Sequence, residues 1–182
     1  MKISVVGFDP SLTHWGVAKG NLDLTTGYLE DVFLQVIEPE RITHKQVRQN
    51  SKDLDATKQL AVAVLEASVG AKAIFAEVPV GSQSARAMAS YGFCVGILGT
   101  MLAQGIQIIE VTAAEVKRAM TGNGHATKGD MIASALSLYP GANFPLHRGK
   151  ITLAAEHVAD ALGAIHAGVN TPLFQNLRKL YV

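Results

Sequence analysis

Hydrophobic positions along the chain form short continuous runs at first and helical repeats later. The run Lys2–Asp9, closed by Asp-Pro-Ser, predicts a buried strand, and apolar stretches at residues 15–19 and 28–37 predict two more. Over residues 43–68, leucine, alanine and valine recur every three or four positions, which is typical of a helix. The later chain predicts a strand at Ala73–Glu77, a small-residue helix at 84–104, a strand at 106–111, two helices flanking a loop at 121–127, and a last helix at 154–168.

This order of elements predicts a mixed α/β fold. The first three strands have short connections and can form an antiparallel meander, whereas the fourth and fifth need helical crossovers and should run parallel to the first. We therefore expect a mixed five-stranded sheet with helices on both faces. No linker, repeat or low-complexity segment interrupts residues 1–182, which predicts a single domain.

Composition narrows the class of protein. The chain has 182 residues, of which 48% are hydrophobic and 17% are charged, so it can bury a sizeable core. Its net charge of +1 argues neither for nor against nucleic acid. Cys94 is the single cysteine, which excludes a disulfide framework and a cysteine-built zinc site, and we expect it to be a small buried hydrophobe.

One uncharged stretch, residues 89–109, superficially resembles a membrane span. Polar residues and a glycine divide it into a helix followed by a strand, so we interpret it as buried interior. The apolar run at the N-terminus reaches Asp9 too soon for the hydrophobic part of an export signal. The expectation is a cytoplasmic protein without a membrane partner.

Several acidic residues are expected at the carboxyl edge of the sheet, where α/β proteins bind their ligands. Asp9 closes the first strand and Glu77 closes the fourth, which should be its neighbour, so both carboxylates should lie at one edge of the sheet. Glu156, His157 and Asp160 share one side of the last helix. That helix is rich in alanine and glycine, which would let it lie close to the sheet and bring His157 and Asp160 to the strand ends.

Such a cluster suits Mg²⁺ or Mn²⁺, because hard cations prefer oxygen ligands. Two ions about 3.5–4 Å apart are a standard device for the attack of water on a phosphodiester. The alternative is that Asp9 caps a turn and Asp160 is a solvated helix residue. His157 could bind metal, move a proton or contact a phosphate, and Glu156 competes with it as the fourth ligand.

A glycine-rich loop with flanking basic residues forms a second candidate site. Residues 121–127 join two helices and carry Gly122 and Gly124, which would let backbone N–H groups approach a phosphate. Lys117, Arg118 and Lys128 bracket this loop with positive charge and are our candidates for binding DNA. The spacing is not that of a P-loop, and a plain helix connection with solvated charges remains the alternative.

Taken together, the motifs resemble those of RuvC-type Holliday junction resolvases, which belong to the RNase H-like superfamily. The resemblance covers nearly the whole chain, and its specificity lies in the order and spacing of the pieces. The matching pieces are Gly7-Phe8-Asp9-Pro10-Ser11-Leu12 with Trp15-Gly16, Ala76-Glu77, Val111-Thr112, Val116-Lys117, Gly122-x-Gly124-x-Ala126-x-Lys128, and His157-Val158-Ala159-Asp160-Ala161-Leu162-Gly163.

The resemblance implies a mechanism and a partner. It implies that four residues are catalytic and bind metal: Asp9, Glu77, His157 and Asp160. It implies two Mg²⁺ ions per site, for which Mn²⁺ can substitute, and places Lys117 and Lys128 near the scissile phosphate. The helix at 84–104 matches the dimer helix of the family, whose members act as homodimers and resolve four-way DNA junctions by paired symmetrical nicks.

One departure from the family stands out. Bacterial members often carry an aromatic wedge three positions after the strand glutamate, where this chain has Val80. This puts junction opening and sequence preference in doubt, although Tyr91 or Phe93 could substitute, and it fits a phage or plasmid version that cuts branched DNA more broadly. The other functions that we consider are a nuclease for RNA or RNA–DNA hybrid, a nucleotide-binding module, and a DNA-binding protein with an inactive nuclease site.

Overall fold

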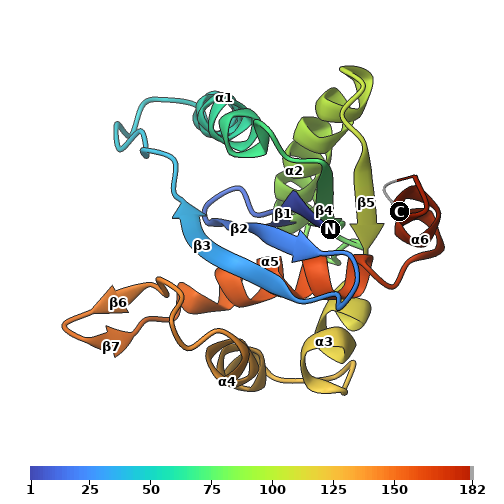
Figure 1. Ribbon diagram of the computed structural model, residues 1–182. Helices are drawn as coiled ribbons and strands as arrows, with labels where there is room; N and C mark the ends of the chain where they lie inside the picture. Colours follow the sequence, from blue (N-terminus) through green and yellow to red (C-terminus); the bar gives the residue numbers. More distant parts are fainter. Residues whose placement is uncertain (181–182) are drawn as a thin grey trace.

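The computed structural model describes residues 1–180 and contains a five-stranded sheet in the order β3-β2-β1-β4-β5 (Figure 1). The antiparallel strands are β1 Lys2–Asp9, β2 Trp15–Asp23 and β3 Leu29–Ile37. The strands β4 Ala73–Glu77 and β5 Ile108–Val111 run parallel to β1, as the crossover connections require. The predicted fold class is confirmed.

Helices cover both faces of the sheet (Figure 1). The helices α1 Gln49–Ser68 and α2 Ala85–Ala103 pack on one face. The other face carries α3 Ala113–Thr121, α4 Lys128–Leu138 and α5 Ala155–Gly168, and α5 lies directly against the sheet. A short helix after α5, α6 Pro172–Arg178, lies beside β5, where Phe174 packs on Phe75.

The sheet separates two hydrophobic cores. Val5 and Phe75 point into the core under α5, whereas Val6 and Phe8 point into the core under α1 and α2. All four side chains are at most 2% exposed. Burial on both faces explains why β1 reads as an almost continuous hydrophobic run rather than as an alternating one.

Several element boundaries differ from the prediction. The helix expected over residues 43–68 begins only at Gln49, because residues 41–46 are exposed and a helix gains most of its stability from packing. The strand expected at 15–19 continues to Asp23, because β1 offers a pairing partner along its whole length. The helix α6 and a small hairpin before α5, described below, carried too short a pattern to be predicted.

The interpretation of residues 89–109 as buried interior was wrong for α2. Four of its 19 residues are buried, including Cys94, which is buried as expected. Apart from Arg86, Ser90 and Thr100, its other residues are apolar and mostly exposed. A Cβ added at Gly92, Gly96 or Gly99 would meet only open space. Among the described residues, α2 alone has the length and composition of a membrane span, with 22% of the apolar window buried.

Candidate active site

The ends of β1 and β4 place two carboxylates side by side. Asp9 is the last residue of β1 and Glu77 the last residue of β4, and the parallel ladder pairs Phe8 with Ala76 immediately before them. The carboxyl edge of the sheet therefore holds both acids, as the strand pattern predicted.

Glycines in the sheet allow α5 to approach and complete the site. A Cβ at Gly7 would lie 2.1 Å from the carbonyl oxygen of Ala161, and a Cβ at Gly16 would lie 2.0 Å from the carbonyl oxygen of His157. Gly16 also pairs directly with Asp9 in the β1–β2 ladder. The backbone of α5 thus rests on the strands at positions that only glycine permits, and its first turns reach the strand ends.

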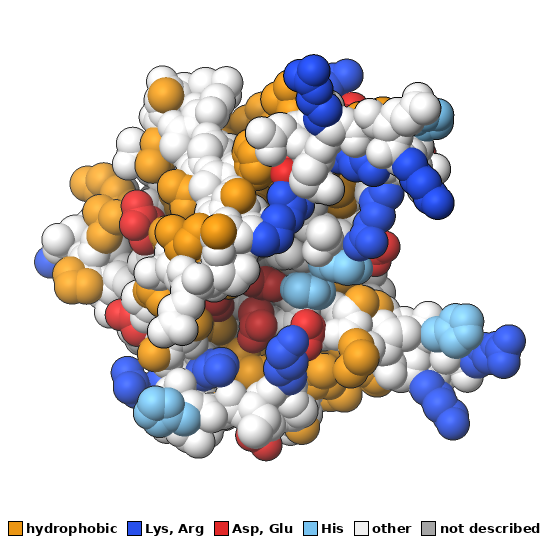
Figure 2. Space-filling view, turned by 180° about the vertical axis from the view of Figure 1, so that it is seen from behind, with side chains coloured by type: hydrophobic (Ala, Val, Ile, Leu, Met, Phe, Trp, Pro, Cys, Tyr) orange, Lys and Arg blue, Asp and Glu red, His pale blue; other side chains and the backbone are white. Residues whose placement is uncertain are grey.

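The acids and His157 line one open hollow at this edge. Its wall includes Asp9 and Glu77 from the sheet and Glu156, His157 and Asp160 from α5. Figure 2 shows the acidic side chains gathered in this hollow, with histidine beside them and Lys and Arg around the rim. All four residues predicted as catalytic and metal-binding are therefore brought together.

A hydrogen bond joins His157 to Asp9. The Nδ1–H group of His157 donates to Asp9 Oδ2 at 2.8 Å, and this contact raises the pKa of the imidazole. Burial raises the pKa of the Asp9 carboxyl, while the same hydrogen bond acts in the opposite direction. The ring of His14 stacks on His157 with their centroids 5.4 Å apart and their planes parallel within 1°. His157 is thereby held in one orientation.

Glu77 and Asp160 carry strongly shifted pKa values. Burial and the neighbouring carboxylates raise the pKa of Glu77 to about 8 and that of Asp160 to about 7, while Lys117 opposes both shifts. Near neutral pH Glu77 is therefore mostly protonated and Asp160 partly so, because burial disfavours their charged forms and the neighbouring carboxylates repel them.

The donor set fits a hard divalent cation. Asp9, Glu77 and Asp160 supply carboxylate oxygens, the ligands that Mg²⁺ and Mn²⁺ prefer, and a cation would offset the repulsion that raises their pKa values. Within residues 1–180, no three His, Cys, Asp or Glu side chains are already gathered closely enough to enclose an ion. The side chains would have to turn toward a bound ion, which their mutual repulsion disfavours in its absence.

Glu156, the competing ligand, is engaged elsewhere. Lys128 Nζ lies 2.9 Å from Oε1 and 2.8 Å from Oε2 of Glu156, so one ammonium group spans both carboxylate oxygens. Lys128 is the first residue of α4, and Thr127 caps that helix with a capping box to Asp130. The ion pair holds Lys128 at the rim of the hollow, where its side chain remains 77% exposed.

Of the three predicted basic residues, Arg118 lies away from the hollow. Its guanidinium packs beside Gly124 and lines a different pocket, next to the end of α5. Lys117, by contrast, is close enough to Glu77 and Asp160 for its positive charge to lower their pKa values against the effect of burial. Neighbouring positions on a helix point about 100° apart, so Lys117 and Arg118 of α3 cannot face the same site.

The structure places His14, which the motifs did not single out, beside the hollow, and it shows where the residues considered for the aromatic wedge lie. His14 stands in the turn after β1, and its place between Asp9 and Trp15 was the signal that could have identified it. Tyr91 of α2 lines the hollow rather than packing inside the helix core, together with Val80, which is 85% exposed. Phe93 packs partly into the core under α1 and α2.

Comparison with known proteins finds similarity in three dimensions. No protein-family model matches the chain, and no curated protein is significantly similar in sequence. RuvC of Thermus thermophilus in complex with Holliday junction substrate matches with a TM-score of 0.62 and 19% identity, over 91% of this chain and 92% of that one. A second Thermus thermophilus RuvC structure matches with a TM-score of 0.59 and 20% identity, over 91% and 92%.

The yeast mitochondrial Holliday junction resolvase Ydc2 also matches, with a TM-score of 0.56 and 14% identity, over 98% of this chain and 86% of that one. The chain has the RuvC-type, RNase H-like fold. In this RuvC fold, the acidic hollow stands at the carboxyl ends of β1 and β4, with α5 laid across them.

Proposed function

We propose that the protein is a metal-dependent endonuclease that resolves four-way, or Holliday, DNA junctions and other branched DNA by paired symmetrical nicks. The observation that carries the proposal is the convergence of Asp9, Glu77 and Asp160 with His157 in one hollow of a RuvC-type fold. A RuvC protein of this fold has been solved with a Holliday junction substrate, which supports branched DNA as the partner.

The three carboxylates are the groups that would hold metal. Two Mg²⁺ or Mn²⁺ ions held by these carboxylates would supply an activated water and neutralise charge at the leaving oxygen. The hydrogen bond from His157 favours the ionised form of Asp9 in spite of its burial. With Nδ1 engaged, Nε2, which lies 3.7 Å from Glu156 Oε1, is the nitrogen of His157 that would bind an ion or contact the scissile phosphate.

Basic residues at the rim would receive the DNA backbone. Lys128 is exposed and anchored by Glu156, and Lys117 lies close enough to Glu77 and Asp160 to lower their pKa values. Their positive charge would bring a phosphate to an otherwise acidic hollow, which repels DNA without a cation.

A second copy of this chain is the partner that fits the exposed face of α2. The face is apolar, uncharged and open at Gly92, Gly96 and Gly99, so another α2 helix could approach closely. A homodimer would carry two hollows, which paired nicks on two strands require.

The substitution Asp9→Asn tests the assignment of the hollow. We expect it to reduce junction cleavage in Mg²⁺ by at least about a hundredfold, because one carboxylate ligand is lost, while the Kd for the junction changes by less than about threefold. The measurement is single-turnover cleavage and binding of a labelled four-way junction.

Asp31→Asn is the matched control, because Asp31 is exposed on β3 and its φ of 52° suits asparagine. It should leave both quantities unchanged. Full activity of the Asp9→Asn protein would overturn the site assignment.

A further inference from the structure

A short hairpin projects from the molecule just before α5. Its strands, β6 Leu146–His147 and β7 Lys150–Ile151, pair antiparallel and are joined by Arg148 and Gly149. Both turn residues have positive φ angles, 51° and 75°, as a two-residue type I′ turn requires. All six residues are exposed, and Figure 1 shows the hairpin extending beyond the sheet and the helices.

The base of the hairpin is fixed to the body of the protein. The side-chain amide of Asn143 accepts a hydrogen bond from the Leu34 N–H group and donates one to the Leu34 carbonyl, each at 2.8 Å, on the edge strand β3. Phe144 is buried, and the Thr152 N–H group donates to the carbonyl of Pro145 at 3.1 Å. A projecting arm with an anchored base keeps a defined direction relative to α5.

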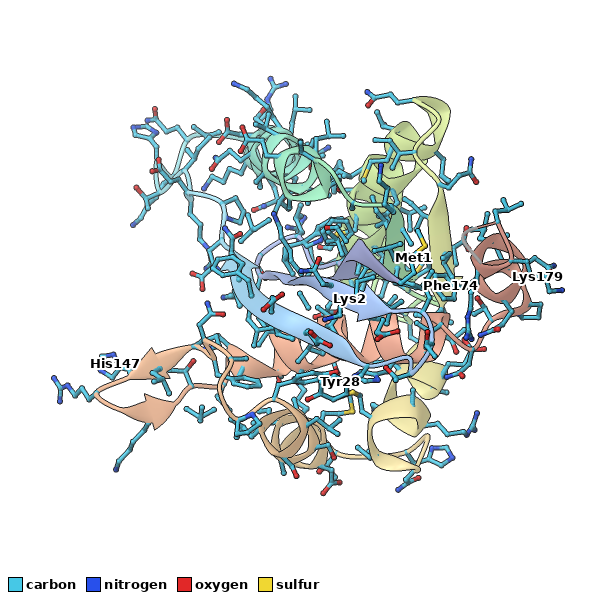
Figure 3. The ribbon with its side chains drawn as sticks, in the orientation of Figure 1. Met1, Lys2, Tyr28, His147, Phe174 and Lys179 are labelled. Carbon is cyan, nitrogen blue, oxygen red and sulfur yellow. The ribbon has the colours of Figure 1, made fainter. Side chains whose placement is uncertain are left out.

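The hairpin is basic and has no acidic counterpart nearby in sequence. Residues 140–155 contain Arg148 and Lys150 but no Asp or Glu. Within residues 1–180, no ion pair forms at either side chain, whereas Lys2 and Lys128 pair with carboxylates. Figure 3 shows His147 at the far end of the arm, so its tip carries the polar and charged groups.

The position of the arm relative to the hollow indicates what it could contact. It leads directly into α5, whose first turn carries Glu156 and His157 of the hollow. Figure 2 shows the arm projecting to one side of the acidic hollow, with a second group of Lys and Arg across from it. The exposed segment between β3 and α1, which carries Arg41, Lys45 and Arg48, lies on the same side of the molecule as the arm (Figure 1).

We propose that the β6–β7 hairpin is a DNA-contacting arm that binds the phosphate backbone of a junction arm beyond the cleavage position. The inference rests on the proposed junction-resolving function and adds a contact outside the hollow. Arg148 and His157 are nine positions apart in the sequence, so their Cα atoms are at most about 30 Å apart. At 3.4 Å per base pair, the contact therefore falls within roughly ten base pairs of the cleaved phosphate.

A nucleic-acid backbone fits this arm better than a protein surface does. The exposed apolar side chains of this segment, Leu146, Ile151 and Leu153, are few and lie toward the base of the hairpin. The two unpaired cations stand at the tip, where they would first meet an approaching polyanion.

The test replaces the two charges and keeps the hairpin. Arg148→Asn creates an Asn-Gly turn, the preferred sequence for type I′, and Lys150→Gln keeps a long polar side chain. The matched control is Lys72→Gln with Lys179→Gln, which removes the same charge from exposed positions. Lys72 precedes β4 at the end opposite Glu77, and Figure 3 shows Lys179 on the other side of the molecule from His147.

Binding to a four-way junction is measured without divalent metal over a range of NaCl concentrations, and cleavage at saturating protein with Mg²⁺. We expect the hairpin variant to bind the junction about tenfold more weakly. The slope of log Kd plotted against log salt concentration should fall by up to about 1.8 per protomer, because each phosphate contact contributes about 0.9. The cleavage rate at saturation should stay within twofold, because the hollow is untouched.

The possible results distinguish a failure of the DNA-contacting arm from a failure of the proposed junction-resolving function. A wild-type protein that binds and cuts junctions, with a hairpin variant indistinguishable from the control, would overturn the arm. A wild-type protein that neither binds nor cuts would overturn the junction-resolving function itself. The charge-preserving pair Arg148→Lys with Lys150→Arg should match the wild type, and a tenfold loss there would show that the contact is not made to phosphate.

Discussion

At the scale of single residues, the hollow brings together Asp9, Glu77 and Asp160, whose negative charges repel one another. Glu77 and Asp160 have folded-state pKa values of about 8 and about 7, well above those of exposed carboxyls. The folded protein therefore holds protons that the unfolded chain releases near pH 4, and these two groups lower folding stability as the pH rises toward 8. A bound cation would replace those protons.

This linkage predicts that stabilisation by Mg²⁺ depends on pH. We expect saturating Mg²⁺ to raise the Tm by roughly 5 °C at pH 8 and much less at pH 6, where Glu77 and Asp160 remain protonated. Calorimetry with and without Mg²⁺ measures the shift. Asp9→Asn should remove most of it, and Asp31→Asn should retain it. Equal shifts at both pH values would contradict the view that these carboxyls bind the ion.

At the scale of elements, the site depends on how closely α5 lies on the sheet. The sequence alone indicated both strand ends and the polar side of α5, because strand runs and helical spacing are local patterns. It also indicated a small-residue helix, and a Cβ at Gly168 of α5 would indeed lie 2.1 Å from the Phe75 ring, but the equally close approaches at Gly7 and Gly16 of the strands are identified only by the paired structure. The β6–β7 hairpin was not predicted because its two strands have only two residues each, too few to show a repeating pattern. The exposure of α2 was not predicted because an apolar composition is the same for a buried helix and for a helix at an interface.

The substitution Gly16→Ala tests whether the site depends on the close contact between α5 and the sheet. Its Cβ would overlap the carbonyl of His157, so α5 must shift, and we expect a loss of about 1–3 kcal/mol of folding stability. Displacement of His157 and Asp160 should reduce cleavage roughly a hundredfold in the protein that remains folded. Gly141→Ala is the control, because a Cβ there meets open space. Normal cleavage by the Gly16→Ala protein would show that the position of α5 is not critical.

At the scale of the whole molecule, the exposed face of α2 is the surface that a second copy of the chain could cover. The outer face of α2 is apolar, and its glycines leave room for a second backbone. The same helix supplies Tyr91 to the hollow, so association through α2 would connect the two sites of a dimer.

We predict that Gly96→Glu converts a dimer into a monomer. The added side chain meets open space in the single chain, so folding should be retained, whereas a buried charge at a helix–helix interface should weaken association strongly. Light scattering coupled to size-exclusion chromatography measures the mass. Leu173→Glu, at an exposed position of α6, should leave the dimer intact. A wild-type protein that is monomeric at all concentrations would refute the dimer.

Cleavage of an end-labelled synthetic four-way junction, with and without Mg²⁺, tests the central claim most directly. Linear DNA duplex and an RNA–DNA hybrid of the same sequence serve as competing substrates. The account predicts paired symmetrical nicks that need the metal and are confined to the junction. Binding without cleavage in either Mg²⁺ or Mn²⁺, or cleavage of the hybrid in preference to the junction, would contradict it.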